Sequence, residues 1–338
     1  MREKRALTRQ RLLALVFACL SGLLTLSIVL FACISTGVIP LGTTNTHATP
    51  GMMTPSPTPE PTPIPPSVLT VVGGAPPIDA KAAYLLDTDT GNVLDDQNAE
   101  QPLPMASTTK IMTALVVIEA ANLKQEVTVS PDIPQYVFQH NGSNAKLVPG
   151  DTLTINDLLY ALMLPSGDDA AIVLARAVAG SSDAFVGMMN CFALRHHLFQ
   201  THFINPDGLT YYDANGKPLP GHYSSARDLA RLTAYALSNP LFAKIVGTRQ
   251  YDLAWSPKHG AYHWTNTNDL FNLYPATTGV KTGFTNEAGY CLVFSATRDH
   301  HHLVGTVLFS SDTDTNQRFR DAKTLLEWGF GLPMLPAY

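Results

Sequence analysis

The sequence predicts an α+β domain whose antiparallel sheet is built from both ends of the chain. Three observations support this fold class: two short β-rich runs open the globular part, a block of helical patterns follows, and three more β-rich runs precede a final helix. Strands on either side of the block must meet in space to form one sheet of five strands. The mostly helical insert is expected to form a second subdomain and the other wall of a cleft.

Residues 82–86 and 93–94 form the predicted opening hairpin. Both runs are apolar, and the segment 87–92 between them carries the Asp and Gly residues that are typical of tight turns. The first helix is expected to begin at Ser107 and to run through an apolar stretch to about Ala121.

Four further helices are predicted in the middle of the chain by apolar spacing and capping residues. Pro165 ends the first of them, and a serine at the N-cap opens the last. Their expected ranges are 156–163, 169–179, 183–197 and 224–237.

The C-terminal third of the chain is β-rich. The runs 278–281, 289–297 and 303–309 are short and are separated by turns. An amphipathic helix is expected at 314–328, where apolar residues recur at helical spacing.

The first 67 residues are not expected to belong to this domain. Residues 1–11 are basic, and the uncharged stretch 12–34 is long enough, at about 1.5 Å per residue, to cross a hydrocarbon core of about 30 Å. The positive-inside rule places 1–11 in the cytoplasm and the rest of the chain outside. Residues 35–67 form a Pro/Thr-rich linker that favours extended polyproline II, and the catalytic domain is expected at 68–338.

Two alternatives to an uncleaved transmembrane anchor stay open. A cleaved signal peptide has the same polarity, although its apolar stretch usually has only about 7–15 residues. Leu30-Phe31-Ala32-Cys33 also resembles a weak lipoprotein cleavage site. All three possibilities export the domain, which would be held at the cell membrane by a single span, or secreted if the segment is cleaved.

Composition argues against two classes of partner. The formal net charge is −5, and the part of the chain after residue 34 has no basic block and no aromatic-basic stripe, so nucleic-acid binding is not expected. The three adjacent residues His300-His301-His302 lie in a predicted turn, where they cannot all face one ion. We therefore expect no metal site and no cofactor.

Three short polar motifs, in this order, point to a serine enzyme. The segment 107–110 would place Ser107 and Lys110 on the same face of a helix, where the amine could act as the base for the hydroxyl. Ser166-Gly167-Asp168 could supply a second polar relay, and Lys281-Thr282-Gly283 could hold a substrate carboxylate on a strand. Each motif alone also fits an ordinary structural role as a helix cap or a strand end.

Five segments together resemble the low-molecular-mass penicillin-binding proteins, the serine-type D-alanyl-D-alanine carboxypeptidases. They occur in the order of that family and cover about residues 80–330. The segments are 104–114 (PMASTTKIMTA), 164–171 (LPSGDDAA), 205–209 (NPDGL), 222–229 (HYSSARDL) and 279–285 (GVKTGFT).

The resemblance implies the β-lactamase-like transpeptidase fold of penicillin-binding proteins, with an antiparallel five-stranded sheet flanked by helices and a mostly helical subdomain. It implies that a serine attacks the penultimate D-alanine of a peptidoglycan stem peptide, and that β-lactam antibiotics acylate the same serine as covalent inhibitors. The catalytic residues it implies are Ser107, Lys110 as general base and Ser166 as relay. The substrate-binding residues it implies are Asp168, Lys281, Thr282, Gly283 and Phe284, with backbone N–H groups of Ser107 and Phe284 as the oxyanion hole.

Two departures from the family pattern stand out. Asp168 occupies a position where the family usually has asparagine, so an amide donor is lost and a negative charge is gained, which could weaken acylation. Longer relatives also carry a C-terminal β-rich domain. Because the sequence ends at Tyr338, we expect that domain to be absent and the N-terminal segment to hold the protein at the membrane.

Two other functions stay open at this stage. A serine β-lactamase would need a positioned carboxylate for deacylation, and no Glu-x-x-Leu-Asn segment lies between Ser166 and Lys281. A non-catalytic domain that senses β-lactams or the cell wall would keep the pocket. The presence of Ser107, Lys110 and Lys281 argues against this reading, whereas Asp168 leaves it open.

Overall fold

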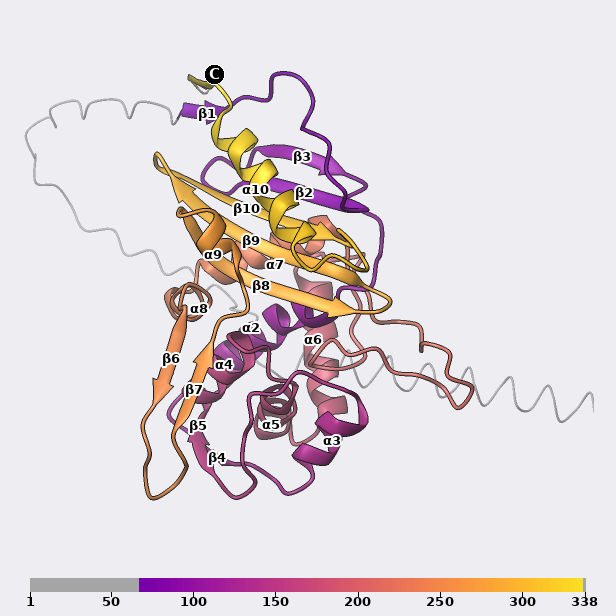
Figure 1. Cartoon of the computed structure of the whole chain (residues 1–338), viewed down its shortest axis with the longest axis vertical. Coiled ribbons are helices and arrows are strands. Elements are labelled where there is room, and N and C mark those ends of the chain that lie inside the picture. The colour runs from indigo at the N-terminus through magenta and orange to yellow at the C-terminus, as the bar shows by residue number, and fades with distance from the viewer. Residues whose placement is uncertain (1–66, 337–338) are drawn as a thin grey trace, which may run out of the picture. The chain divides into compact units, whose positions relative to one another are not determined.

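A single antiparallel sheet of five strands forms the upper part of the molecule in Figure 1, in the order β3-β2-β10-β9-β8. The computed structural model describes residues 67–336, so the predicted cytoplasmic segment, membrane anchor and nearly all of the linker lie outside the described residues. The strands are β2 Ala82–Asp87, β3 Val93–Gln97, β8 Thr277–Thr285, β9 Gly289–Arg298 and β10 His301–Leu308. Strands from both ends of the chain therefore share one sheet, which confirms the predicted α+β class.

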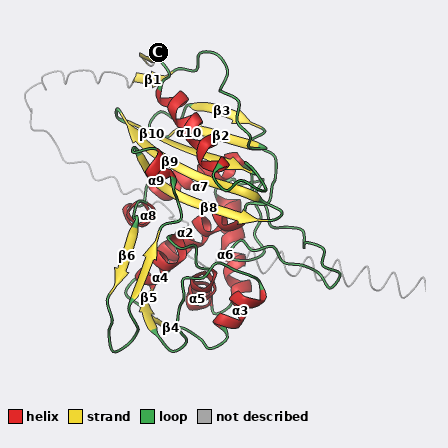
Figure 2. Ribbon diagram, viewed as in Figure 1, coloured by secondary structure: helices red, strands yellow, loops and turns green. Residues whose placement is uncertain are grey.

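Helices make up most of the rest of the chain and are drawn in red in Figure 2. They are η1 Ala106–Thr109, α2 Lys110–Ala120, α3 Ile133–Gln139, α4 Ile155–Met163, α5 Asp168–Ala179, α6 Ser182–Arg195, α7 Ala226–Leu237, α8 Pro240–Val246, α9 Leu270–Leu273 and α10 Gln317–Phe330. Three two-stranded ladders complete the fold: β1 Ser67–Leu69 with β11 Met334–Pro336, β4 Glu126–Thr128 with β5 Thr152–Thr154, and β6 Gln250–Leu253 with β7 Tyr262–Thr265.

Both faces of the sheet are covered, and neighbouring residues of one strand belong to different cores. Leu303 of β10 packs in the cluster that contains Phe319 of α10, whereas Val304 belongs to the larger cluster formed with the helical part. This separation follows from the alternation of side chains along a strand. The sheet is therefore a rigid support for whatever lies along its free edge at β8.

The central helix α2 is buried over most of its length, from Lys110 to Val117. A helix that is apolar on all sides must lie inside a protein, and α2 contacts α4, α5, α6 and α7. Its first residue is therefore carried into the interior, although that residue is a lysine.

The predicted helices and strands are found, with shifts at their ends. Ser107 lies in the 3-10 turn η1, and the α-helix begins three residues later at Lys110. The N-cap of α7 is Ser225, whose side chain accepts a hydrogen bond from the backbone N–H of Asp228, so the predicted start at residue 224 is early.

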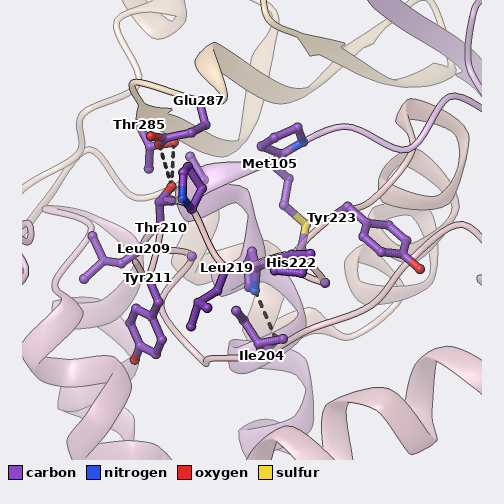
Figure 3. A pocket seen from close by; sticks show the side chains of 16 residues that line it. Met105, Ile204, Leu209, Thr210, Tyr211, Leu219, His222, Tyr223, Thr285 and Glu287 are labelled. Carbon is purple, nitrogen blue, oxygen red and sulfur yellow. Dashed lines mark hydrogen bonds between the residues drawn. The ribbon is translucent and has the colours of Figure 1, made fainter. Parts of the chain in front are cut away.

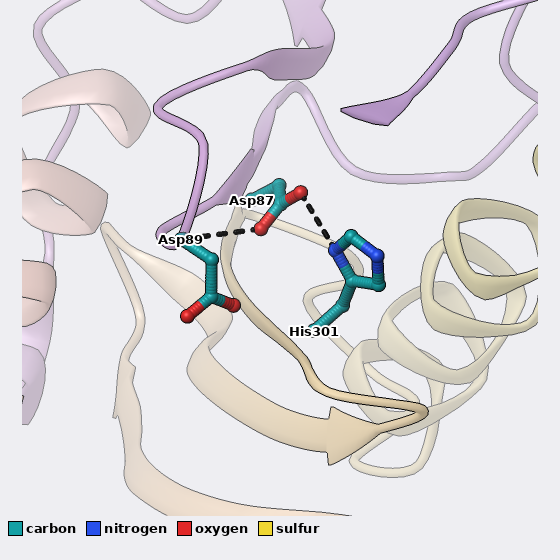
Figure 4. A group of neighbouring side chains, drawn as sticks. All are labelled: Asp87, Asp89 and His301. Atoms are coloured by element: carbon teal, nitrogen blue, oxygen red, sulfur yellow. Dashed lines mark hydrogen bonds and ion pairs between the residues drawn. The ribbon is translucent and has the colours of Figure 1, made fainter. Parts of the chain in front are cut away.

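The turn of the first hairpin is fixed by a buried carboxylate at the end of β2 (Figure 4). Asp87 accepts hydrogen bonds from the Thr90 hydroxyl and the Asp89 backbone N–H, and Nδ1 of His301 lies 3.0 Å from it. Asp87, Asp89 and His301 also bring potential metal ligands within 4.8 Å of one another. Their contacts to the hairpin and to β10 account for this arrangement, so we propose no metal site here.

Within residues 67–336, no single helix has both the length and the apolar character needed to cross a membrane. Only α5 and α6 taken together, which meet at an angle of 84°, reach that length and composition.

Candidate active site

Ser107 and Lys110 lie side by side at the start of the central helix. Nζ of Lys110 donates a hydrogen bond to Oγ of Ser107 over 2.8 Å, which is the contact that their spacing predicts. Lys110 is fully buried and Ser107 is 8% exposed. The turn before them contains Ala106 at φ +49°, an unusual conformation for a residue with a side chain. A largely buried hydroxyl is thus held in direct contact with a fully buried amine.

Three acceptors surround the Lys110 amine. Besides Ser107, Nζ donates to Oδ1 of Asp168 over 2.5 Å and to the backbone carbonyl of Asp207 over 2.7 Å. An ammonium group has three N–H donors, so each of them has a partner. The amine is held in one position, with one of its bonds directed at the serine hydroxyl.

Asp168 opens α5 and is fully buried against Lys110. Its second oxygen, Oδ2, accepts a hydrogen bond of 2.6 Å from the backbone N–H of Ser143. Burial raises the pKa of Asp168 to about 7, because the charged form is poorly solvated, although the positive charge of Lys110 opposes this change. The structure therefore places this carboxylate against the lysine, and a contact with substrate stays a prediction.

The loop 205–209 holds the nucleophile turn from the other side. The backbone N–H of Gly208 donates to the Asn205 side chain, which in turn donates to the carbonyl of Leu209. Gly208 has φ +94°, and a Cβ atom there would lie 2.1 Å from the carbonyl oxygen of Ala106. Sequence reasoning noted this segment but gave it no role. A backbone carbonyl such as that of Asp207 has no side-chain signature, and the Asn-Pro-Asp-Gly turn pattern was the available signal.

The edge strand β8 passes directly alongside Ser107. A Cβ atom on Gly283 would lie 2.9 Å from the carbonyl oxygen of Met105 and 3.2 Å from the backbone nitrogen of Ser107. Only glycine allows the strand and the turn to approach this closely. The next residue, Phe284, is 42% exposed, so the strand reaches the surface beside the nucleophile.

Lys281 and Thr282 precede that point of contact. Lys281 is buried and its Nζ donates to the carbonyl of Thr282 over 3.0 Å. Burial, followed by the positive charges of Lys110 and Arg318, lowers the pKa of Lys281 well below its ordinary value. Oγ1 of Thr282 lies 2.7 Å from Oγ1 of Thr267. The two lysines are therefore close enough for the charge of Lys110 to act on Lys281.

Ser166 lies on the turn between α4 and α5, two residues before Asp168. It is buried and has φ +65°, so like Ala106 it carries a side chain at a positive φ. Unusual backbone conformations of this kind concentrate at functional sites. The relay role of Ser166 stays a prediction.

Two further residues support the backbone of the site. Arg318 of α10 donates to the carbonyl of Gly283 over 3.1 Å. Nδ1 of His222 accepts from the backbone N–H of Ile204, and its Nε2 lies 2.8 Å from Oγ1 of Thr109. Both residues hold the backbone around Ser107 in place.

The chain is similar to known proteins over most of its described length. The sequence pattern of the D-alanyl-D-alanine carboxypeptidase family, Peptidase S11, matches residues 70–312. A D-alanyl-D-alanine carboxypeptidase of Streptomyces sp. strain K15 is 39% identical over 76% of this chain and 89% of the relative. The carboxypeptidase DacF of Bacillus subtilis is 35% identical over 73% of this chain, which spans only 61% of that longer relative.

The fold agrees with these sequence similarities. The crystal structure of the Streptomyces K15 DD-transpeptidase superposes with a TM-score of 0.70 at 37% identity, over 77% of this chain and all of the other. The expected transpeptidase fold of the penicillin-binding proteins is thereby confirmed.

Proposed function

Because the chain belongs to the D-alanyl-D-alanine carboxypeptidase family, we propose that it removes the terminal D-alanine of peptidoglycan stem peptides through an acyl-enzyme on Ser107. The observation that carries this proposal is the buried contact of 2.8 Å between Ser107 and Lys110, alongside the free edge of β8. This arrangement brings together a nucleophile, a base and an edge strand with which an extended peptide can pair.

In the first step Oγ of Ser107 attacks the carbonyl carbon of the penultimate D-alanine, and the hydroxyl proton passes to the amine of Lys110. This step requires the uncharged amine, since an ammonium group cannot accept a proton. Asp168 is the nearest carboxylate to this amine. We therefore assign Asp168 a positioning role that acts through Lys110, because its charge decides how readily the lysine gives up its own proton.

The developing oxyanion would be stabilised by the backbone N–H groups of Ser107 and Phe284. The close approach of Gly283 to the nucleophile turn places these two parts of the backbone next to each other. Such donors typically contribute a few kcal/mol to lowering the barrier, about 3 kcal/mol each.

Collapse of the tetrahedral intermediate breaks the C–N bond, and the departing D-alanine must receive a proton. Ser166 and Lys281 are assigned to this transfer, in which the proton that Lys110 took from Ser107 passes to the amine through the hydroxyl of Ser166, and Lys281 stabilises the relay. Lys281 and Thr282 hold the terminal carboxylate, which supplies a negative charge to a buried lysine. Lys110 then takes a proton from water as the water attacks the ester, and returns a proton to Oγ of Ser107 when the ester bond breaks.

Two further parts of the proposal concern ligand and location. β-Lactams carry a strained amide next to a carboxylate, so they would acylate Ser107 in the same orientation as the peptide. The uncharged stretch 12–34, which has flanking basic residues on its N-terminal side only, supports a single-pass anchor with the catalytic domain outside the cell. Secretion after cleavage is the alternative for the same segment.

The test uses the full chain in mild detergent with a fluorescent penicillin and a peptide that ends in D-Ala-D-Ala. Wild type is expected to be labelled and to release D-alanine, whereas Ser107→Ala should do neither. Ser238→Ala is the matched control, because this exposed hydroxyl contacts only the carbonyl of Tyr235. Equal labelling of wild type and Ser107→Ala would refute the acyl-enzyme.

Other outcomes separate the alternative functions. Stable labelling without release of D-alanine would indicate a sensor, and rapid loss of label with bulk penicillin hydrolysis would indicate a β-lactamase. Because the solved relative is named a DD-transpeptidase, glycylglycine is added in a second series, in which a new peptide product would show that an amine can replace water.

A further inference from the structure

A cavity of about 270 Å³ opens beside the nucleophile turn and is lined by sixteen described residues (Figure 3). Its walls come from the turn before Ser107, from the loop that contains Thr210 and Leu219, and from the end of β8 at Thr285. Most of the lining is apolar. The cavity adjoins the proposed site but contains none of the residues assigned to the chemistry above.

Glu287 is the one acidic side chain of this lining, which contains no lysine or arginine among the described residues. Two hydroxyls hold its carboxylate: Thr210 donates to Oε2 over 2.7 Å, and Tyr212 donates to Oε1 over 2.8 Å. Burial alone would raise the pKa of Glu287, but these hydrogen bonds outweigh it and hold the pKa below its usual range. The carboxylate is thus charged at neutral pH.

The charge of the other titratable groups does not cancel that of Glu287. His222 also lines the cavity, but burial lowers its pKa to about 3, so the imidazole is neutral. Besides Thr210 and Tyr212, the hydroxyl of Thr285 and the backbone N–H of Glu287 stabilise this carboxylate. A single negative charge in a largely apolar cavity favours a ligand of the opposite sign.

The direction of the peptide on β8 leads toward this cavity. Under the proposed function, the terminal carboxylate lies at Lys281 and Thr282, and the scissile carbonyl lies where Gly283 meets the nucleophile turn. The residue before the D-Ala-D-Ala pair must then follow β8 in the direction of Thr285. Both Thr285 and Glu287 line the cavity, so this residue is brought to its mouth.

We propose that this cavity is a specificity subsite in which Glu287 binds a primary ammonium group on the part of the substrate that precedes the D-Ala-D-Ala pair. Two sources carry this chemistry: the side chain of the preceding residue, and the free amino terminus of a short peptide. The inference rests on the proposed function and adds the class of substrate that the site prefers. Thr210 and Tyr212 act as positioning residues, because they fix the carboxylate.

Three peptides distinguish the two sources. Nα-acetyl-L-lysyl-D-Ala-D-Ala carries only a side-chain amine, L-norleucyl-D-Ala-D-Ala carries only an amino terminus, and Nα-acetyl-L-norleucyl-D-Ala-D-Ala carries neither. For the wild-type full chain, kcat/KM is expected to be about two- to fivefold higher for one amine-bearing peptide than for the neutral one, as for a partly exposed ion pair. In Glu287→Gln this ratio should fall close to one.

Two controls test whether the change in peptide preference is specific to Glu287. Glu126→Gln removes the same charge from β4, where the carboxylate pairs with Lys258, and it should retain the wild-type ratio. Labelling of Glu287→Gln by fluorescent penicillin shows that Ser107 of the variant still reacts.

Three results would overturn the inference. The subsite is refuted if wild type cleaves all three peptides at equal kcat/KM, and the peptidase function then stands. It is also refuted if Glu287→Gln keeps the preference, because another group would then recognise the amine. If wild type releases D-alanine from no peptide, the proposed function and the subsite fail together.

Discussion

Replacing Asp168 by asparagine tests how the unusual second motif controls the base. The two charged groups lie 2.5 Å apart and both side chains are fully buried. At an effective dielectric constant near 20, two unit charges at this distance attract each other by about 6 to 7 kcal/mol. This figure is an upper limit for the effect of the carboxylate, because burial of an ion pair carries a large opposing desolvation cost.

The expected effect is a shift in the pH dependence of acylation. An ionised Asp168 stabilises the ammonium form of Lys110, which is inactive as a base. Burial raises the pKa of Asp168 and so disfavours its ionised form, and the shift is therefore smaller than the full attraction. A neighbouring opposite charge typically shifts an ionisation by about one to three pH units, or about 1.4 to 4 kcal/mol.

In Asp168→Asn the midpoint of the acylation profile should therefore move to lower pH by about one to three units. At pH 7 the second-order rate of labelling should rise about tenfold or more. The assay measures labelling by fluorescent penicillin between pH 5 and 10, and its midpoint is a property of the Lys110–Asp168 pair rather than of either group.

The neighbouring Asp169 provides a matched control. Its carboxylate accepts hydrogen bonds from the backbone N–H groups of Ala145, Leu147 and Ala170, and it has no contact with the lysine. Asp169→Asn should lower the free energy of unfolding by about 1 to 3 kcal/mol and leave the midpoint unchanged. An unchanged or raised midpoint in folded Asp168→Asn would refute the reasoning.

Two further substitutions test the supports of the nucleophile turn. Gly208→Ala should lower the free energy of unfolding by about 3 kcal/mol and slow penicillin labelling, because the added Cβ would lie 2.1 Å from the backbone. The control is Gly216→Ala, at a glycine with φ +75° but open space around it, which should lower the free energy of unfolding by only about 1 kcal/mol. An equal decrease in both variants would contradict the steric argument. His222 should make the protein less stable in acid. In the unfolded protein its imidazole binds a proton below the usual pKa of about 6.5, whereas burial in the folded protein lowers this pKa to about 3. Between pH 6.5 and 5, urea denaturation should therefore show a loss of roughly 2 kcal/mol in wild type that is absent in His222→Gln.

Local patterns were sufficient for the larger elements of the fold. The apolar spacing of 314–328 and the Asp/Gly turn at 87–92 correspond to α10 and to the loop of the first hairpin. The two-stranded ladders and the helices α3, α8 and α9 were not predicted. Their elements have only three to seven residues, and segments this short are stabilised by tertiary contacts rather than by their own periodicity.

In the site, too, contacts between residues close in sequence could be predicted, whereas contacts between distant residues could not. The Ser107–Lys110 contact follows from i, i+3 geometry, so the sequence was enough to predict it. The carbonyl of Asp207 reaches Lys110 across 97 residues, and Arg318 reaches Gly283 across 35 residues. Neither contact is encoded by a local pattern, since each depends on how the helical subdomain and α10 pack against the edge of the sheet.

The charge of Asp168 also affects how the site would receive an anionic substrate. Lys281 and Arg318 are buried and, within residues 67–336, neither has a carboxylate within ion-pair distance. Buried cations without a partner are costly, so the carboxylate of a substrate would stabilise them. An ionised Asp168 already supplies part of that negative charge and favours the charged form of Lys281, which reduces the gain from binding. The substitution to asparagine therefore acts twice, once on the base and once on carboxylate binding, and only the second effect should disappear with a substrate whose terminal carboxylate is replaced by an amide.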